Sequence, residues 1–192
     1  MRKIRRDEVL PLGAYEEVRD RFRNRVIAVK VHRRVGVGDR VTFVFENRDT
    51  MLFQIQEMLR AERITGEREI QAEIDVYNDL LPGPREISAT FFVEITDKER
   101  IREDLHGLVG LEVALVLGAR RILARFEEGR ATPEKLSAVQ YLRWPLDELA
   151  RSALADPEVP ARLEIAHPRY THATDLGPET RRSLLDDLDD WK

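Results

Sequence analysis

Carboxylates on the apolar sides of two consecutive predicted helices are the residues best placed for chemistry. In the stretch from Phe45 to Ile64 (FENRDTMLFQIQEMLRAERI), helical spacing predicts that Glu62 lies within the apolar face. In the helix that follows, Glu73 falls inside the apolar face and Glu69 falls at its edge. Because burying an unpaired charge is costly, these carboxylates need a positively charged partner or a metal ion.

A metal ion is one such partner. Inward glutamates combined with Glu-x-x-His steps hold iron or manganese in carboxylate-rich helical bundles, and one step of this kind occurs at positions 103–106. The predicted ligands of an iron or manganese site are therefore Glu62, Glu69, Glu73, Glu103 and His106. Such bundles use two Glu-x-x-His steps and this chain has one, so chance spacing is an alternative explanation.

A buried network of ion pairs is the interpretation that the sequence favours for these carboxylates. The predicted members of this polar cluster are Arg33, Glu46, Arg48, Glu57, Arg60, Glu62, Glu73, Tyr77 and Asn78. Within it, the spacing of Glu57 and Arg60 also fits a pair on one helix surface. A third possibility is a pocket in which the same arginines bind a carboxylate or a phosphate of a small molecule.

A second group of polar residues runs from His167 to His172 (HPRYTH) after a predicted strand. Its two histidines could bind a metal, but a turn whose Tyr170 packs back on the sheet is the favoured interpretation. No serine lies in a glycine-flanked nucleophile elbow. Gly36-Val37-Gly38 is too short for a phosphate-binding loop, so no nucleotide-binding motif is present.

The elements that must position these residues predict an α+β fold. An extended lead-in is expected over residues 1–13, and an acidic C-terminal helix is expected as an appendage over 178–192. Periodicity predicts helices at 15–34, 50–64, 67–81, 98–106 and 146–154, and strands at 41–46, 86–95, 112–117, 121–126, 137–143 and 162–166. We therefore expect a single domain over 1–192, with an N-terminal helix and a two-helix unit packed on a mainly antiparallel sheet.

Composition limits the classes of protein to which the chain can belong. Its 192 residues, 42% of them hydrophobic, are enough for one domain with a sizeable core, and they include no cysteine. Disulfides, zinc–thiolate sites and thiol nucleophiles are therefore excluded. No apolar run is long enough to span a membrane and the N-terminus does not resemble a signal peptide, so we expect a cytoplasmic protein.

The net charge of −4 conceals an uneven distribution of charge. Residues 1–34 contain eleven Lys or Arg against five Asp or Glu, and residues 145–192 contain six against eleven. A basic segment could bind nucleic acid, which is a further alternative for the function. Because no aromatic residues interleave with the early arginines, the sequence favours solvated or mutually neutralising ends.

An ordered series of segments resembles a known bacterial family. The series comprises FENRDTMLFQIQEMLRAERI, EIDVYNDLLPGP, ISATFFVEI, SAVQYLRWPL and HPRYTHATDL, and it spans nearly the whole chain. The family is the one labelled domain of unknown function 3501, whose genes often lie beside those for rubrerythrin-like proteins and an iron–sulfur oxidoreductase. The resemblance implies an accessory or interaction protein of a redox or peroxide-defence system, with those proteins as its partners. It implies no catalytic residues, so whether the protein is an enzyme stays open.

Overall fold

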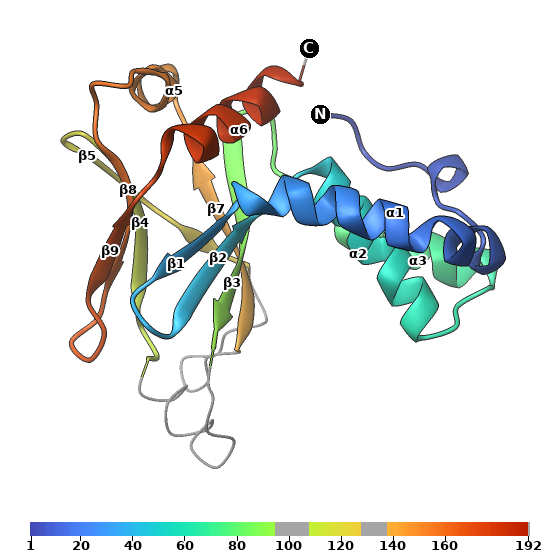
Figure 1. The fold of residues 1–192 in the computed structure, drawn as a ribbon. Helices are drawn as coiled ribbons and strands as arrows, with labels where there is room; N and C mark the ends of the chain where they lie inside the picture. Colours follow the sequence, from blue (N-terminus) through green and yellow to red (C-terminus); the bar gives the residue numbers. More distant parts are fainter. Residues whose placement is uncertain (95–107, 128–137, 192) are drawn as a thin grey trace.

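The computed structural model describes residues 1–94, 108–127 and 138–191, which form a helical unit beside two β-sheets (Figure 1). The helical unit consists of α1 (Leu12–Val31), α2 (Arg48–Ala61) and α3 (Glu67–Asn78), preceded by the short 3-10 helix η1 (Arg6–Glu8). Met51, Ile55 and Ile74 are fully buried in its hydrophobic core, and Ile4 and Val9 of the N-terminal segment complete that core. The apolar faces of short helices need this mutual burial, because helices of such length are marginal alone.

The described strands form two sheets in which each pairing is antiparallel. The first sheet has the order β1-β2-β3-β7-β6, with β1 (Arg34–Val37), β2 (Val41–Phe45), β3 (Glu86–Val93), β7 (Val139–Pro145) and β6 (Arg125–Phe126). The second has the order β5-β4-β8-β9, with β5 (Arg120–Leu123), β4 (Glu112–Leu117), β8 (Ala161–Ala166) and β9 (His172–Asp175).

Side chains of both sheets share one hydrophobic core. Phe43 of β2 contacts Phe91 of β3 edge to face at 5.4 Å between ring centroids, and Trp144 of β7 lies 6.0 Å from Phe45. Two further helices, α5 (Glu148–Ala155) and α6 (Pro178–Asp189), add apolar residues such as Leu184 to this core. In Figure 1, α6 crosses above the strands and carries the end of the chain back toward Met1.

The helical unit covers part of the outer face of the first sheet. Tyr141 of β7 packs against the core of the helical unit, and the hydroxyl of Ser88 donates a hydrogen bond to the carbonyl of Leu80. The guanidinium of Arg143 donates to the carbonyl of Leu81 at 2.8 Å. Polar side chains on this face of the sheet are therefore buried, and this decides the environment of Glu46.

The predicted α+β class is confirmed, and the structure corrects several details. The strands form two sheets instead of one, because strand partners are chosen by long-range packing that periodicity does not encode. Residues 34–37 are a strand, whereas the sequence predicted a helix end there, and residues 172–175 form a strand that the sequence did not predict after its turn. Asn47 caps α2 by accepting a hydrogen bond from the Thr50 amide, where Asp49 or Thr50 had been the expected cap. The predicted helix 98–106 lies outside the described residues.

Across residues 1–94, 108–127 and 138–191, none of the helices has the length and apolarity that a membrane crossing requires.

Candidate functional site

The predicted polar cluster is divided among separate places in the structure. Arg33 and Glu46 lie where the first sheet meets the helical unit, and both are almost fully buried. Arg48 contacts the N-terminal segment instead, through Glu8. Glu57 faces α1. The structure therefore assembles smaller groups than the sequence predicted.

Glu46 is a buried carboxyl group at the end of β2. Its side chain is 1% exposed, and its Oε1 accepts a hydrogen bond from the hydroxyl of Thr90. Its Oε2 has no hydrogen-bond partner among the described residues. Burial raises the pKa of Glu46, and the hydrogen bond from Thr90 with the positive charges of Lys30 and Arg33 offsets only part of that rise. Burial therefore favours the neutral form of this carboxyl group over the charged form.

Arg33 joins the end of α1 to α6 through a buried ion pair. Its Nη1 lies 2.7 Å from Oδ2 of Asp187, and its Nη2 donates to the carbonyl of Ser183 at 2.9 Å. Asn47 donates a longer hydrogen bond, 3.4 Å, to the other oxygen of Asp187. Burial raises the pKa of Asp187, and the Arg33 guanidinium opposes this rise. Because both partners are largely removed from water, breaking this pair leaves a buried charge uncompensated.

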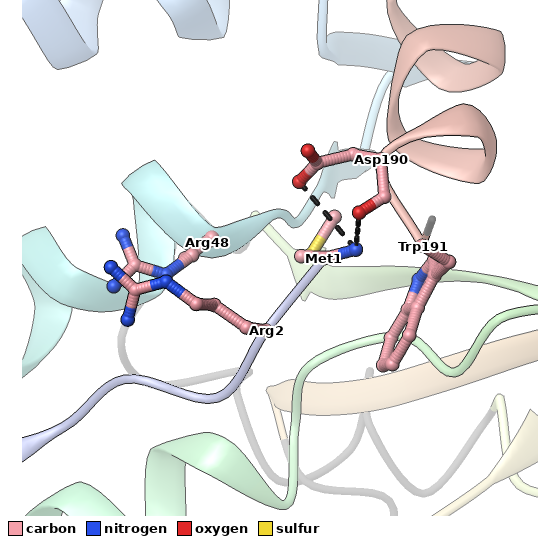
Figure 2. Close-up of a pocket in the computed structure, with 5 residues that line it drawn as sticks. All are labelled: Met1, Arg2, Arg48, Asp190 and Trp191. Atoms are coloured by element: carbon pink, nitrogen blue, oxygen red, sulfur yellow. Dashed lines mark hydrogen bonds and ion pairs between the residues drawn. The ribbon is translucent and has the colours of Figure 1, made fainter.

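An open hollow lies where the N-terminal segment meets the end of α6 (Figure 2). It has a volume of about 590 Å³ and is lined by Met1, Arg2, Arg48, Asp190 and Trp191. The amino group of Met1 contacts both the carbonyl and the carboxylate of Asp190. Figure 2 shows the two guanidinium groups side by side and the indole of Trp191 across the hollow from them.

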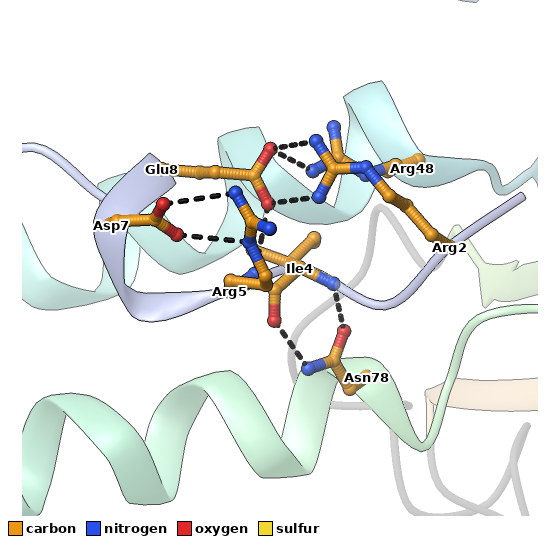
Figure 3. Close-up of polar contacts among 7 residues, drawn as sticks. All are labelled: Arg2, Ile4, Arg5, Asp7, Glu8, Arg48 and Asn78. Carbon is orange, nitrogen blue, oxygen red and sulfur yellow. Dashed lines mark hydrogen bonds and ion pairs between the residues drawn. The ribbon is translucent and has the colours of Figure 1, made fainter.

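Glu8 orients both arginines of this hollow (Figure 3). Its two oxygens accept hydrogen bonds of 2.6 and 2.7 Å from Arg2, and one of them also accepts from Arg48. The amide of Arg5 donates to Glu8 at 3.0 Å. Arg2 is the main cause that lowers the pKa of Glu8 to about 2, so this carboxylate stays charged. Since two guanidinium groups share one carboxylate, one positive charge remains in excess.

Asn78 and Tyr77, also predicted members of the cluster, hold the N-terminal segment on α3. The side-chain amide of Asn78 accepts from the Ile4 amide at 2.8 Å and donates to the Ile4 carbonyl at 2.9 Å. This pair of bonds imitates the pairing of two strands and is shown in Figure 3. Tyr77 is buried in the core of the helical unit.

Glu57 and Arg60 do not pair with each other, contrary to the sequence prediction. Glu57 binds Arg19 through two hydrogen bonds of 2.7 and 2.8 Å and accepts a third from the buried Tyr15 hydroxyl. Arg60 pairs with Glu16 at 2.6 Å. These partners all lie on α1, so the charges attach α1 to α2. The Arg19 guanidinium is the main cause that lowers the pKa of Glu57.

The predicted inward carboxylates do not gather. The expectation that Glu62 is buried is wrong: α2 ends at Ala61, and Glu62 is an exposed C-cap residue followed by Arg63 with a φ of 53°. Glu69 is exposed and Glu73 is half-buried. Glu103 and His106 lie outside the described residues. Within the described ranges, no three His, Asp or Glu side chains gather in a way that could hold a metal ion.

The predicted turn forms at residues 168–169, ahead of β9, which begins at His172. Tyr170 is 5% exposed, and its hydroxyl donates to the carbonyl of Val37 at 2.7 Å while accepting from the amide of Arg40 at 3.0 Å. The ring of His172 lies 4.4 Å from that of Tyr170. The prediction that Tyr170 packs back on the sheet is confirmed, and its contacts join β9 to the hairpin of β1 and β2.

Much of the basic N-terminal region is paired within the chain. Ion pairs connect Arg2 to Glu8, Arg5 to Asp7, Arg6 to Glu67, Arg19 to Glu57 and Arg25 to Asp49. These internal ion pairs reduce the positive charge that is available to bind the phosphate backbone of a nucleic acid.

Sequence reasoning missed Glu8, Asp187 and Trp191 as members of these sites. Asp187 follows Leu184 by three residues and precedes Leu188, so helical spacing placed it beside the apolar face. That spacing could have identified Asp187 as a candidate member of a buried ion pair. Nothing in the sequence pattern pointed to Glu8, because its partners Arg2 and Arg48 meet only through the tertiary fold.

Comparison with known proteins finds relatives of this chain. A family model described as "Protein of unknown function (DUF3501)" matches residues 3–188. A crystal structure of a novel protein of unknown function from Burkholderia pseudomallei K96243 is similar to the fold, with a TM-score of 0.91 and 36% sequence identity. The match covers 98% of this chain and 100% of that chain. Among curated proteins, none matches this chain.

Proposed function

This chain belongs to the family described as Protein of unknown function (DUF3501), and we propose that it is an accessory interaction protein of a bacterial redox or peroxide-defence system. The resemblance to that family supplies the redox setting, because it implies genes for a rubrerythrin-like protein and an iron–sulfur oxidoreductase as neighbours. Those two proteins are the proposed partners.

The observation that carries the proposal is the internal pairing of the inward charges. Arg33 binds Asp187, and Arg48 binds Glu8, so both arginines attach one segment of the chain to another. Charges used in this way rigidify the fold and hold α6 and the N-terminal segment in place. A rigid surface loses little conformational freedom when it binds another protein, which favours an interaction role.

The exposed end of the molecule has the composition of a binding surface. Trp191 is 37% exposed and lies across from Arg2 and Arg48, and tryptophan and arginine are enriched among residues that dominate protein–protein binding. This surface supports binding to a partner and requires no chemical step by the chain itself.

Direct binding to the proposed partners tests this function. The purified chain is titrated by calorimetry into a rubrerythrin-like protein and into an iron–sulfur oxidoreductase, the two partners that the family resemblance implies, with an unrelated protein of similar net charge as the control. We expect saturable binding to one partner and a change in its peroxide or electron-transfer activity. Absence of binding to both partners at the highest soluble concentrations would reject the proposal.

Elemental analysis tests the competing metal site. The chain is purified without chelator, both as wild type and as Glu73→Gln. Stoichiometric iron or manganese that is lost in the variant would contradict an accessory protein without its own chemistry. Equal, substoichiometric metal in both samples is the expected result.

A further inference from the structure

We propose that the hollow between Arg2, Arg48 and Trp191 binds a small organic anion in which one carboxylate or phosphate is attached to a planar ring. This site goes beyond the accessory role proposed above and does not depend on it. Its lining residues come from the N-terminal segment, the first turn of α2 and the residues after α6.

The two arginines provide an anion-binding side with unused donors. A guanidinium group presents five N–H donors, and Glu8 occupies two nitrogens of Arg2 but only one of Arg48. The Nε of Arg48 is buried and has no hydrogen-bond partner among the described residues. Because that nitrogen is closed off from the hollow, the donors open to a ligand are the outer N–H groups of the two guanidiniums that Glu8 leaves unused.

Glu8 acts as an internal counter-ion that orients the arginines without neutralising both. Its pKa of about 2 means that it stays ionised and keeps both guanidinium groups in position. One positive charge is left over for the ligand. Because planar guanidinium groups match the geometry of carboxylate and phosphate oxygens, these are the anions that the pair would bind.

Trp191 provides the side of the hollow that a planar ring would contact. Its indole is 37% exposed and faces the arginines across a volume of about 590 Å³, within the range of small-molecule sites. Aromatic rings stack on an exposed indole with a favourable contribution. The carboxylate of Asp190 also lines the hollow, where the amino group of Met1 compensates its charge, so the surplus positive charge of the site is that of the two arginines.

Tryptophan fluorescence gives a site-specific readout of this binding. The chain has two tryptophans, and Trp144 is 0% exposed in the core, so a stacked ring can quench only Trp191. The probes are adenosine monophosphate, which joins a ring to a phosphate, and 4-hydroxybenzoate, which joins a ring to a carboxylate. Adenosine supplies a ring without an acid, and inorganic phosphate supplies the anion without a ring.

We expect one ring-bearing anion to quench the emission with a dissociation constant of about 1 mM or tighter, and the ring alone and phosphate alone to bind at least about tenfold more weakly. Calorimetry on the same protein measures binding independently of fluorescence.

Substitutions then test the assignment of residues. Trp191→Ala and Arg48→Gln should each weaken the calorimetric affinity at least about tenfold, whereas Arg182→Gln, a change at an arginine 67% exposed and paired with Glu179, should leave it unchanged. Trp191 lies two residues past the end of α6 and is partly exposed. Trp191→Ala should therefore keep the fold and still test the site if Arg48→Gln unfolds. Absence of binding by either ring-bearing anion, equal affinity for phosphate alone, or unchanged affinity in Trp191→Ala would overturn the proposal.

Discussion

Replacing Glu46 with glutamine removes a buried titrating group from the junction between the first sheet and the helical unit. The glutamine carbonyl still accepts from the Thr90 hydroxyl, and its amide replaces Oε2, which has no partner among the described residues. Burial raises the pKa of Glu46 above its ordinary value of 4.5, so the folded protein holds this proton at pH values where the unfolded chain has lost it.

The sign of the pH effect follows from proton binding. Below pH 4.5 both states carry the proton, and Glu46 adds no pH dependence to the free energy of unfolding. As the pH rises above this value, the unfolded chain releases its proton first, so the free energy of unfolding falls by about 1.4 kcal/mol per pH unit until the folded pKa is reached. Glutamine does not titrate, so Glu46→Gln should gain stability relative to wild type across this window.

Urea denaturation of both proteins, from about pH 4 to about pH 8 and followed by Trp144 fluorescence, measures this difference. The variant Glu62→Gln is the control, because Glu62 is exposed and its replacement should change stability little at any pH. If Glu46 were instead ionised and stabilised by Lys30 and Arg33, the glutamine variant would lose about 3–5 kcal/mol at neutral pH. That result would refute the reasoning.

Three other substitutions test the remaining contacts. Arg33→Gln leaves Asp187 buried and unpaired, and should lower the free energy of unfolding by about 3–5 kcal/mol in urea denaturation, with partial recovery on adding Asp187→Asn. Glu8→Gln should cost about 1–2 kcal/mol at neutral pH after allowance for screening. Because the folded pKa of Glu8 is lowered to about 2, this cost is complete above pH 4.5 and disappears as the pH falls through 2, which denaturation at several pH values can follow. Tyr170→Phe removes the hydrogen bond to the Val37 carbonyl and should destabilise the protein by about 1–2 kcal/mol in thermal unfolding. An unchanged melting temperature in this variant would contradict the role given to the Tyr170 hydroxyl.

Local patterns were enough to locate most of the elements. The alternation of residues 41–46 predicts a strand, and the structure has β2 at Val41–Phe45. The second helix of the two-helix unit was predicted from residue 67, where α3 begins. These predictions succeed because helix and strand periodicities are set by neighbours along the chain.

Burial of individual charges was predicted poorly for a physical reason. Glu62 lies one residue past the end of α2, and a helical pattern continued beyond that point placed an exposed side chain in the core. Glu46 follows a strand whose outer face the helical unit covers, and this cover comes from residues distant in sequence. Periodicity indicates which side of an element a residue occupies, but only packing shows whether that side meets water.

The amino-acid sequence by itself determined the α+β class, the absence of cysteine chemistry and the positions of most helices and strands, because these depend on composition and on contacts between near neighbours. The tertiary structure alone decided that the strands form two sheets and that Arg33 pairs with Asp187, 154 residues away. It also decided that Arg2, Arg48 and Trp191 line one hollow. Such pairings depend on how distant segments pack. The sequence contains many arginines, and its local pattern does not specify which of them will contact a given carboxylate.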